Sequence, residues 1–137
     1  MLQRLDESSS EFQGRGEYLE ALECMERGLI LRHHIFGSES DEVWNACKAT
    51  AEICNILAMR YLQKDELETV LELLKKADIL TERDLRGRAA TFNNFACYYR
   101  RQGKLFAALK YLQKVGDAKS MEKSIARYFP NTYPPSM

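Results

Sequence analysis

The sequence lacks an excess of either charge, a long apolar segment and a catalytic motif, and each absence narrows the class of protein. Its 20 basic and 20 acidic residues cancel to a net charge of zero, whereas a surface that binds nucleic acid carries a basic excess. No apolar run approaches the roughly 20 residues that span a bilayer. The composition therefore predicts neither nucleic-acid binding nor membrane insertion.

Export signals and paired cysteines are also missing. Residues 1–6 contain no apolar block of secretory length, and Asp6 with Glu7 argues against an organelle transit peptide. The chain has four cysteines at neither metal-ligand nor redox spacing: Cys24, Cys47, Cys54 and Cys97. We interpret them as free apolar thiols, which are typical of a reducing compartment and predict a cytoplasmic location.

No set of catalytic or metal-ligating residues occurs at a recognisable spacing. Gly14 and Gly16 flank Arg15 without a preceding strand, so we interpret them as a helix–helix turn and not as a phosphate-binding loop. His33 and His34 are adjacent on a predicted helix and point about 100° apart, so they cannot both face one metal. We expect a cation pair near the helix end, and no enzyme activity, cofactor or metal site.

Two helical runs of apolar residues define the stretch 89–115. They precede and follow Gly103 and consist of Phe92, Phe95, Ala96, Tyr99, Leu105, Ala108, Leu109, Leu112 and Val115. This spacing predicts a helical hairpin with its turn at Gly103.

The hairpin pattern occurs two more times. One copy lies earlier in the chain, with its turn at Asp65, and a degraded copy lies earlier still, with its turn at Gly16. In every copy the same spacing separates the first hairpin position from the small residue of the second helix, in the pairs Leu5 and Ala21, Cys54 and Val70, Phe92 and Ala108. The chain is therefore predicted to contain three related hairpins.

This pattern resembles the tetratricopeptide repeat, which places a large residue, a small residue and a tyrosine on the first helix and a small residue on the second. The resemblance is strongest at Phe92-x-x-Phe95-Ala96-x-x-Tyr99, followed by Gly103. Both spacings between copies exceed the family's period of about 34 residues, so we expect longer connections between hairpins. Residues 35–43 are similar to the connector of the kinesin-light-chain subgroup.

The resemblance implies an all-α fold, a right-handed α-solenoid of about three hairpins plus a C-terminal capping helix. The hairpins are expected at about 2–34, 40–80 and 86–115, and the capping helix at about 117–129. Residues 1–129 then form one repeat domain.

The ends of these elements carry further expectations. Pro130 should stop the capping helix, and residues 130–137 should be an extended or disordered tail. Ser38-x-x-Asp41 and Asp65-x-x-Glu68 predict capped helix starts. Ser8 and Ser9 occupy packing positions in the first copy, which leaves open whether residues 2–14 form a helix.

The resemblance also implies a non-catalytic protein–protein adaptor whose first helices line a concave groove for a peptide or helix. The groove positions are Glu52, Asn55, Ile56, Met59, Gln63, Ala90, Asn93, Asn94, Cys97, Arg100 and Arg101. The three asparagines stand out because an amide can both donate to and accept from a peptide backbone. Equally, they could bond within the helix surface.

Two further alternatives stay open. The basic residues Arg83, Arg86, Arg88, Arg100, Arg101 and Lys104 are either solvated surface or a site for an acidic partner. The array could instead be a structural or assembly subunit that contacts partners through its ends, or an unrecognised enzyme. Asp6 and Ser10 replace the Lys and Asn with which chaperone-binding members grip a carboxylate, so a chaperone C-terminus is not the expected ligand.

Overall fold

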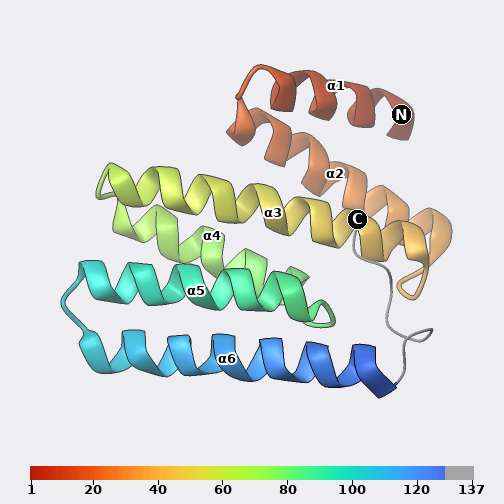
Figure 1. Ribbon diagram of the computed structural model, residues 1–137. Helices are drawn as coiled ribbons and strands as arrows, with labels where there is room; N and C mark the ends of the chain where they lie inside the picture. The colour runs from red at the N-terminus through yellow and green to blue at the C-terminus, as the bar shows by residue number, and fades with distance from the viewer. Residues whose placement is uncertain (129–137) are drawn as a thin grey trace.

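The computed structural model describes residues 1–128, and within them the regular elements are six helices and no strand (Figure 1). They are α1 (Leu2–Gly14), α2 (Tyr18–Phe36), α3 (Asp41–Gln63), α4 (Leu67–Leu80), α5 (Leu85–Arg101) and α6 (Leu105–Tyr128). The expected tail at 130–137 and its stop at Pro130 lie outside the described residues. The all-α class and the three hairpins are confirmed.

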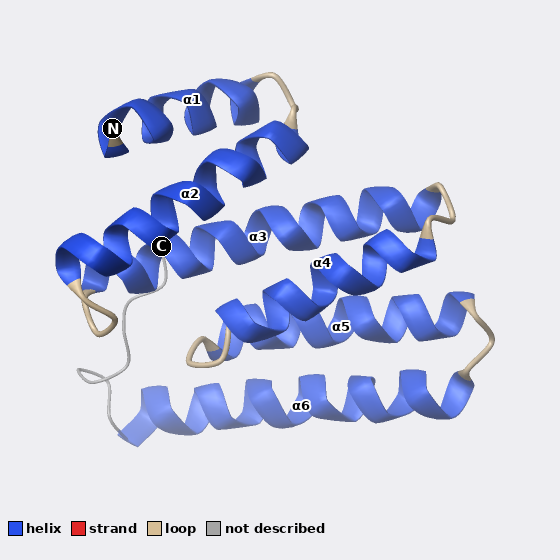
Figure 2. Cartoon of the chain, turned by 180° about the vertical axis from the view of Figure 1, so that it is seen from behind, coloured by secondary structure: helices blue, strands red, loops and turns tan. Residues whose placement is uncertain are grey.

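The hairpins stack in chain order, each contacting the next. α3 contacts both α2 and α5, and α4 lies across α3 and α5, as the rear view shows (Figure 2). Within the described residues α1 contacts no helix except α2. The first hairpin is therefore joined to the stack mainly through α2, with Arg60 of α3 also donating to the Gly16 carbonyl in its turn, while the second and third share a broader interface. The handedness of the solenoid stays a prediction.

The three hairpin turns have the same backbone geometry. Each first helix ends with the carbonyl of Phe12, Tyr61 or Tyr99 accepting the N–H of Glu17, Glu66 or Lys104 at 2.8–3.0 Å. One turn residue in each is left-handed, namely Gly16 (φ 74°), Asp65 (φ 62°) and Gly103 (φ 74°). This is the Schellman arrangement, in which glycine is favoured because it has no Cβ.

The core confirms the predicted register of the hairpins. All six residues of the equally spaced pairs are buried: Leu5, Ala21, Cys54, Val70, Phe92 and Ala108. In the third hairpin Tyr111 of α6 stacks on Phe95 and Tyr99 of α5, with ring centroids 4.8 and 5.6 Å apart. The second helix of that hairpin is thereby fixed against the first.

The connections between hairpins are not longer than usual, which corrects the sequence-based expectation. Residues 37–40 join α2 to α3 and residues 81–84 join α4 to α5, so the two connections are equal in length. α2 has 19 residues against 14 in α4, and α3 has 23 against 17 in α5. The spacing from the first hairpin to the second is therefore longer than the spacing from the second to the third because α2 and α3 are longer, and not because the loop between them is.

The expected capping helix is not a separate element. α6 runs without a break from Leu105 to Tyr128, with Gly116 inside it, so the predicted end at Val115 is wrong. A glycine inside a helix costs only about 1 kcal/mol, and packing beyond it compensates. Ala118 is buried, and Glu122 pairs with Arg86 of α5.

A side-chain cap is present at the start of α3 but not at the start of α4. Ser40, not Ser38, caps α3, because its Oγ accepts the N–H of Val43 at 3.2 Å. Asp65 caps nothing; Glu66 precedes α4 without a side-chain bond. The open question about residues 2–14 is answered, since α1 forms and buries Ser9.

The turn at Asp65 generates a stability prediction. Asp65→Gly should raise the free energy of unfolding by about 0.5–1 kcal/mol, because glycine adopts a positive φ without steric cost. Asp65→Ala should lower it, since alanine has the same Cβ and no polar side chain to compensate. The ion pair with Arg101 (3.6 Å) is solvent-exposed and contributes little. Urea denaturation of the three proteins measures the order, and an alanine variant as stable as the glycine variant would contradict it.

Candidate functional site

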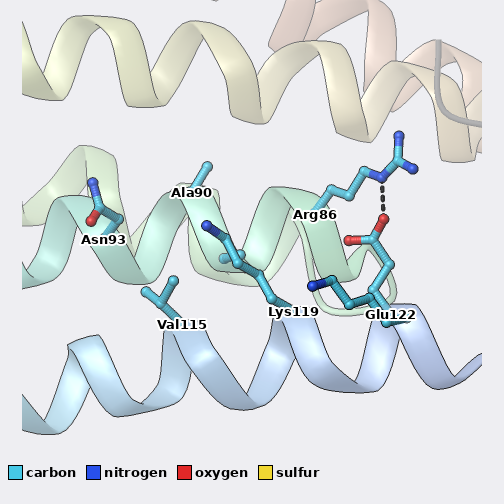
Figure 3. Close-up of a pocket in the computed structure, with 8 residues that line it drawn as sticks. Arg86, Ala90, Asn93, Val115, Lys119 and Glu122 are labelled. Carbon is cyan, nitrogen blue, oxygen red and sulfur yellow. Dashed lines mark hydrogen bonds and ion pairs between the residues drawn. The ribbon is translucent and has the colours of Figure 1, made fainter.

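Two hollows lie side by side along α5. The first, of about 460 Å³, lies between α3 and α5 and is lined by four predicted groove residues, Glu52, Asn55, Ile56 and Ala90. The second, of about 600 Å³, lies between α5 and α6 (Figure 3). Arg86 and Ala90 line both, so the hollows meet at α5 and form one irregular surface, which we call the α5 groove.

The α5 groove has a mixed lining. Asn93 lines the second hollow from α5, and Val115 and Lys119 line it from α6 (Figure 3). Sequence reasoning missed the charged members Lys48, Asp84, Arg86, Lys119, Glu122 and Lys123. Only Arg86 carried a signal, as part of the basic set. The residues on α6 could not be found because that helix was expected to end at Val115.

The other predicted positions lie outside both hollows. Met59 and Cys97 are half-buried and pack against the core. Gln63, Arg100 and Arg101 are exposed at the last residues of α3 and α5. About half of the predicted groove residues therefore line the two hollows, and the other half lie elsewhere on the molecule.

Two of the three asparagines bond to each other across the helices. Asn94 of α5 donates to Oδ1 of Asn55 of α3 at 2.9 Å, and Asn55 in turn donates to Oγ1 of Thr91 at 3.1 Å. Thr91, fully buried, donates to the Gly87 carbonyl. Asn55 and Asn94 therefore bond between α3 and α5, and not within the surface of one helix as the second alternative supposed. Asn93 remains exposed in the groove.

Most of the basic set is paired within the chain. Arg83 donates to Glu39 at 2.7 Å, which holds the pKa of that carboxyl below its usual value. The guanidinium Nη2 of Arg88 lies 3.7 Å from the carboxylate Oδ1 of Asp78. Arg101 donates to the carbonyl of Leu62, near the end of α3, at 2.8 Å. These contacts favour a structural role for these residues over a site for an acidic ligand.

Charge is nonetheless divided along the chain, which the sequence analysis missed when it considered only the net charge of the whole chain. Residues 1–84 contain 10 basic and 18 acidic side chains, and residues 85–137 contain 10 basic and 2 acidic. The net charges are therefore −8 and +8. The third hairpin is a strongly basic surface attached to an acidic one.

The asparagine pair generates the second prediction. Asn94→Ala should lower the free energy of unfolding by about 1 kcal/mol, because it leaves the half-buried Oδ1 of Asn55 without its donor. Asn93→Ala, one residue away and exposed, is the matched control and should change stability by less than about 0.5 kcal/mol. Thermal or urea melts compare the two, and equal losses would show that the bond between Asn55 and Asn94 does not stabilise the fold.

The cysteines generate the third prediction. Cys54 is fully buried, and burial, with a smaller contribution from the Glu26 carboxylate, raises the pKa of its thiol to about 11. Because the thiolate is the reactive form, Cys54 should be modified last by a thiol reagent in the native state. Cys24, Cys47 and Cys97 are half-buried and should react earlier. Mass spectrometry of partly labelled protein gives the order; early modification of Cys54 contradicts its assignment to the core.

A metal-ligand cluster and a membrane-spanning helix are both absent from the described residues. Within 1–128, no group of three or more His, Cys, Asp or Glu side chains is placed to hold a metal ion. None of the helices α1 to α6 is long and apolar enough to cross a bilayer. The arrangement of the molecule is that of a helical repeat protein, in which stacked hairpins present a surface.

The comparison with protein families agrees with this class. Residues 88–115, which run from α5 into α6, match the tetratricopeptide repeat family, so the resemblance noted in the sequence is confirmed. The kinesin-light-chain subgroup stays a prediction. Comparison with curated proteins and with solved structures found no match. The other two hairpins repeat the turn geometry and the buried pairs of the matched one.

Proposed function

We propose that this protein is a non-catalytic adaptor that binds an extended peptide or a helix of a partner in the α5 groove. Tetratricopeptide repeats are generally protein–protein interaction modules, and the match at residues 88–115 supports that role. The observation that carries the proposal is the pair of hollows that meet along α5, where an exposed small residue, Ala90, leaves room for a ligand.

The lining suits a polypeptide with both apolar and charged side chains. Ile56, Ala90 and Val115 provide apolar contact, while Lys48 and Glu52 provide charges of both signs. Hollows of this size accommodate a few side chains each. Asn93 has an exposed amide that can donate to and accept from a peptide backbone. The ligand is therefore expected to be a peptide segment recognised over several residues.

The second candidate is an assembly subunit that contacts its partners through the ends of the array. The observation that favours it is a group of large apolar side chains exposed on α6. The cytoplasmic location, inferred from the free thiols, and the absence of enzyme activity and of nucleic-acid binding stay predictions.

A groove-blocking variant tests the adaptor proposal. Ala90→Arg places a long side chain where the two hollows meet, and Ala90 is exposed, so the melt should not change. Ser38→Arg adds the same charge in the connection before α3, away from the groove, and is the control. Immobilised parent and Ser38→Arg proteins should capture the same partner from a native extract, and Ala90→Arg should capture at least about tenfold less of it.

Quantitative mass spectrometry of the three captures measures this difference, followed by binding isotherms for the partner found. Equal capture by Ala90→Arg, with an unchanged melt, would exclude the α5 groove as the binding site. The assembly candidate would then be the better account.

A further inference from the structure

The outward side of α6 carries an exposed apolar surface. Leu105, Leu109 and Leu112 are 62%, 61% and 47% exposed, and Phe106 beside them is 92% exposed. The leucines are spaced by four and three residues, so they lie on one side of the helix. We call these four residues the α6 stripe. Contiguous apolar surface of this kind marks an interaction site more often than scattered single residues do.

The positions of the three leucines are covered in the two preceding hairpins, whereas those of Phe106, which are Glu68 and Leu19, are exposed. The turn register gives the equivalents of the three leucines as Leu67, Leu71 and Leu74 in α4, and Tyr18, Leu22 and Met25 in α2. Leu74 and Leu22 are buried, and the other four are partly buried against the core.

In both cases the covering element is the first helix of the next hairpin. α5 contacts α4, and α3 contacts α2. Arg60 of α3, for example, lies over the ring of Tyr18 at 4.4 Å, and Tyr18 is the equivalent of Leu105. Within residues 1–128, the three leucines of the α6 stripe form the same kind of surface without a covering helix.

We propose that the α6 stripe is the docking site for an amphipathic helix of a partner protein that has acidic residues beside its apolar side. The helical form follows from the two internal interfaces, where a helix covers the equivalent residues. The acidic character of the partner follows from the charge of α6. Beyond Gly116 the same side of the helix continues with Lys119, Lys123 and Arg127. Residues 85–128 contain two acidic residues, and one of them, Glu122, is already paired with Arg86.

A second copy of this chain fits the stripe poorly. Two α6 helices facing each other would bring basic residues against basic residues. The first helix of a second copy does not fit either. The buried Phe95 and Tyr98 of α5 correspond to Ser8 and Glu11 of α1, so α1 lacks the apolar side chains that would cover the leucines.

An anionic membrane surface would also attract a basic helix with exposed leucines and a phenylalanine. The internal interfaces favour a helix over lipid, because the chain itself covers this side twice with a helix. The two occupants are distinguished below.

The test uses a synthetic, fluorescently labelled helical peptide with leucines spaced by four and three residues and glutamates beside them. The full chain should bind it with a micromolar dissociation constant that rises with salt. Leu105→Gln/Leu109→Gln should weaken binding by about tenfold or more, and the fold should be intact because both side chains are exposed. Ile79→Gln, at a 74% exposed apolar residue of α4, is the matched control and should bind as the parent does.

Two further peptides complete the design. A peptide with lysine in place of every glutamate, and a scrambled acidic peptide, should bind at least about tenfold more weakly than the acidic helix. Lys119 and Lys123 also line the α5 groove, but none of the four residues of the α6 stripe does. Ala90→Arg should therefore not weaken acidic-peptide binding, which separates the leucine surface from the α5 groove and lets the two proposals fail independently.

Each contrary result overturns the proposal in a defined way. Failure of the acidic peptide to bind, or equal binding of the lysine peptide, would remove an acidic helix as the occupant. A dimer of the parent in sedimentation velocity that Leu105→Gln/Leu109→Gln dissociates would assign the stripe to a second copy. Stripe-dependent binding to phosphatidylserine–phosphatidylcholine vesicles, without peptide binding, would assign it to a membrane.

Discussion

A single helical hairpin cannot bury both of its apolar sides, and the rest of this structure follows from that constraint. One side of each second helix packs on its own first helix through a small residue, as the buried Ala108 of α6 and Phe92 of α5 illustrate. The other side needs the next hairpin, which is why Leu74 in α4 is buried and Leu112 in α6 is not. The stack is therefore held together by one repeated contact, between the second helix of a hairpin and the first helix of the next. In the described chain the second helix of the last hairpin, α6, has no such neighbour.

The sequence predicted the hairpins because their register depends on residues that are close in the chain. Phe92 and Ala108 lie on either side of the single hairpin turn at Gly103. The helical period and the glycine at that turn therefore suffice to pair them. The continuity of α6 could not be read in this way. Gly116 disfavours helix locally, whereas the burial of Ala118 against α5 that outweighs it is a tertiary contact.

The candidate site was predictable only in part for a related reason. Repeat position indicated that Ala90 and Asn93 face outward, and both line the α5 groove. It could not indicate that Asn94 meets Asn55, since the two belong to different helices and lie far apart in the chain. An amide that seemed available to a ligand is thus occupied by a neighbouring helix. The opposite charges of the two parts of the chain were visible in the sequence, and counting them by segment would have found them.

The unequal spacing of the hairpins has a consequence for how this chain can vary in length. α2 and α3 have 19 and 23 residues, against 14 and 17 in α4 and α5, while the joining segments 37–40 and 81–84 are the same length. Each of the two longer helices therefore has about one and a half extra turns. When two antiparallel helices are lengthened by the same amount, the loop that connects them moves farther from the rest of the stack and nothing else changes. Insertions or deletions near this loop would be accommodated in complementary pairs, one in each helix, and would leave the contacts of the stack unchanged.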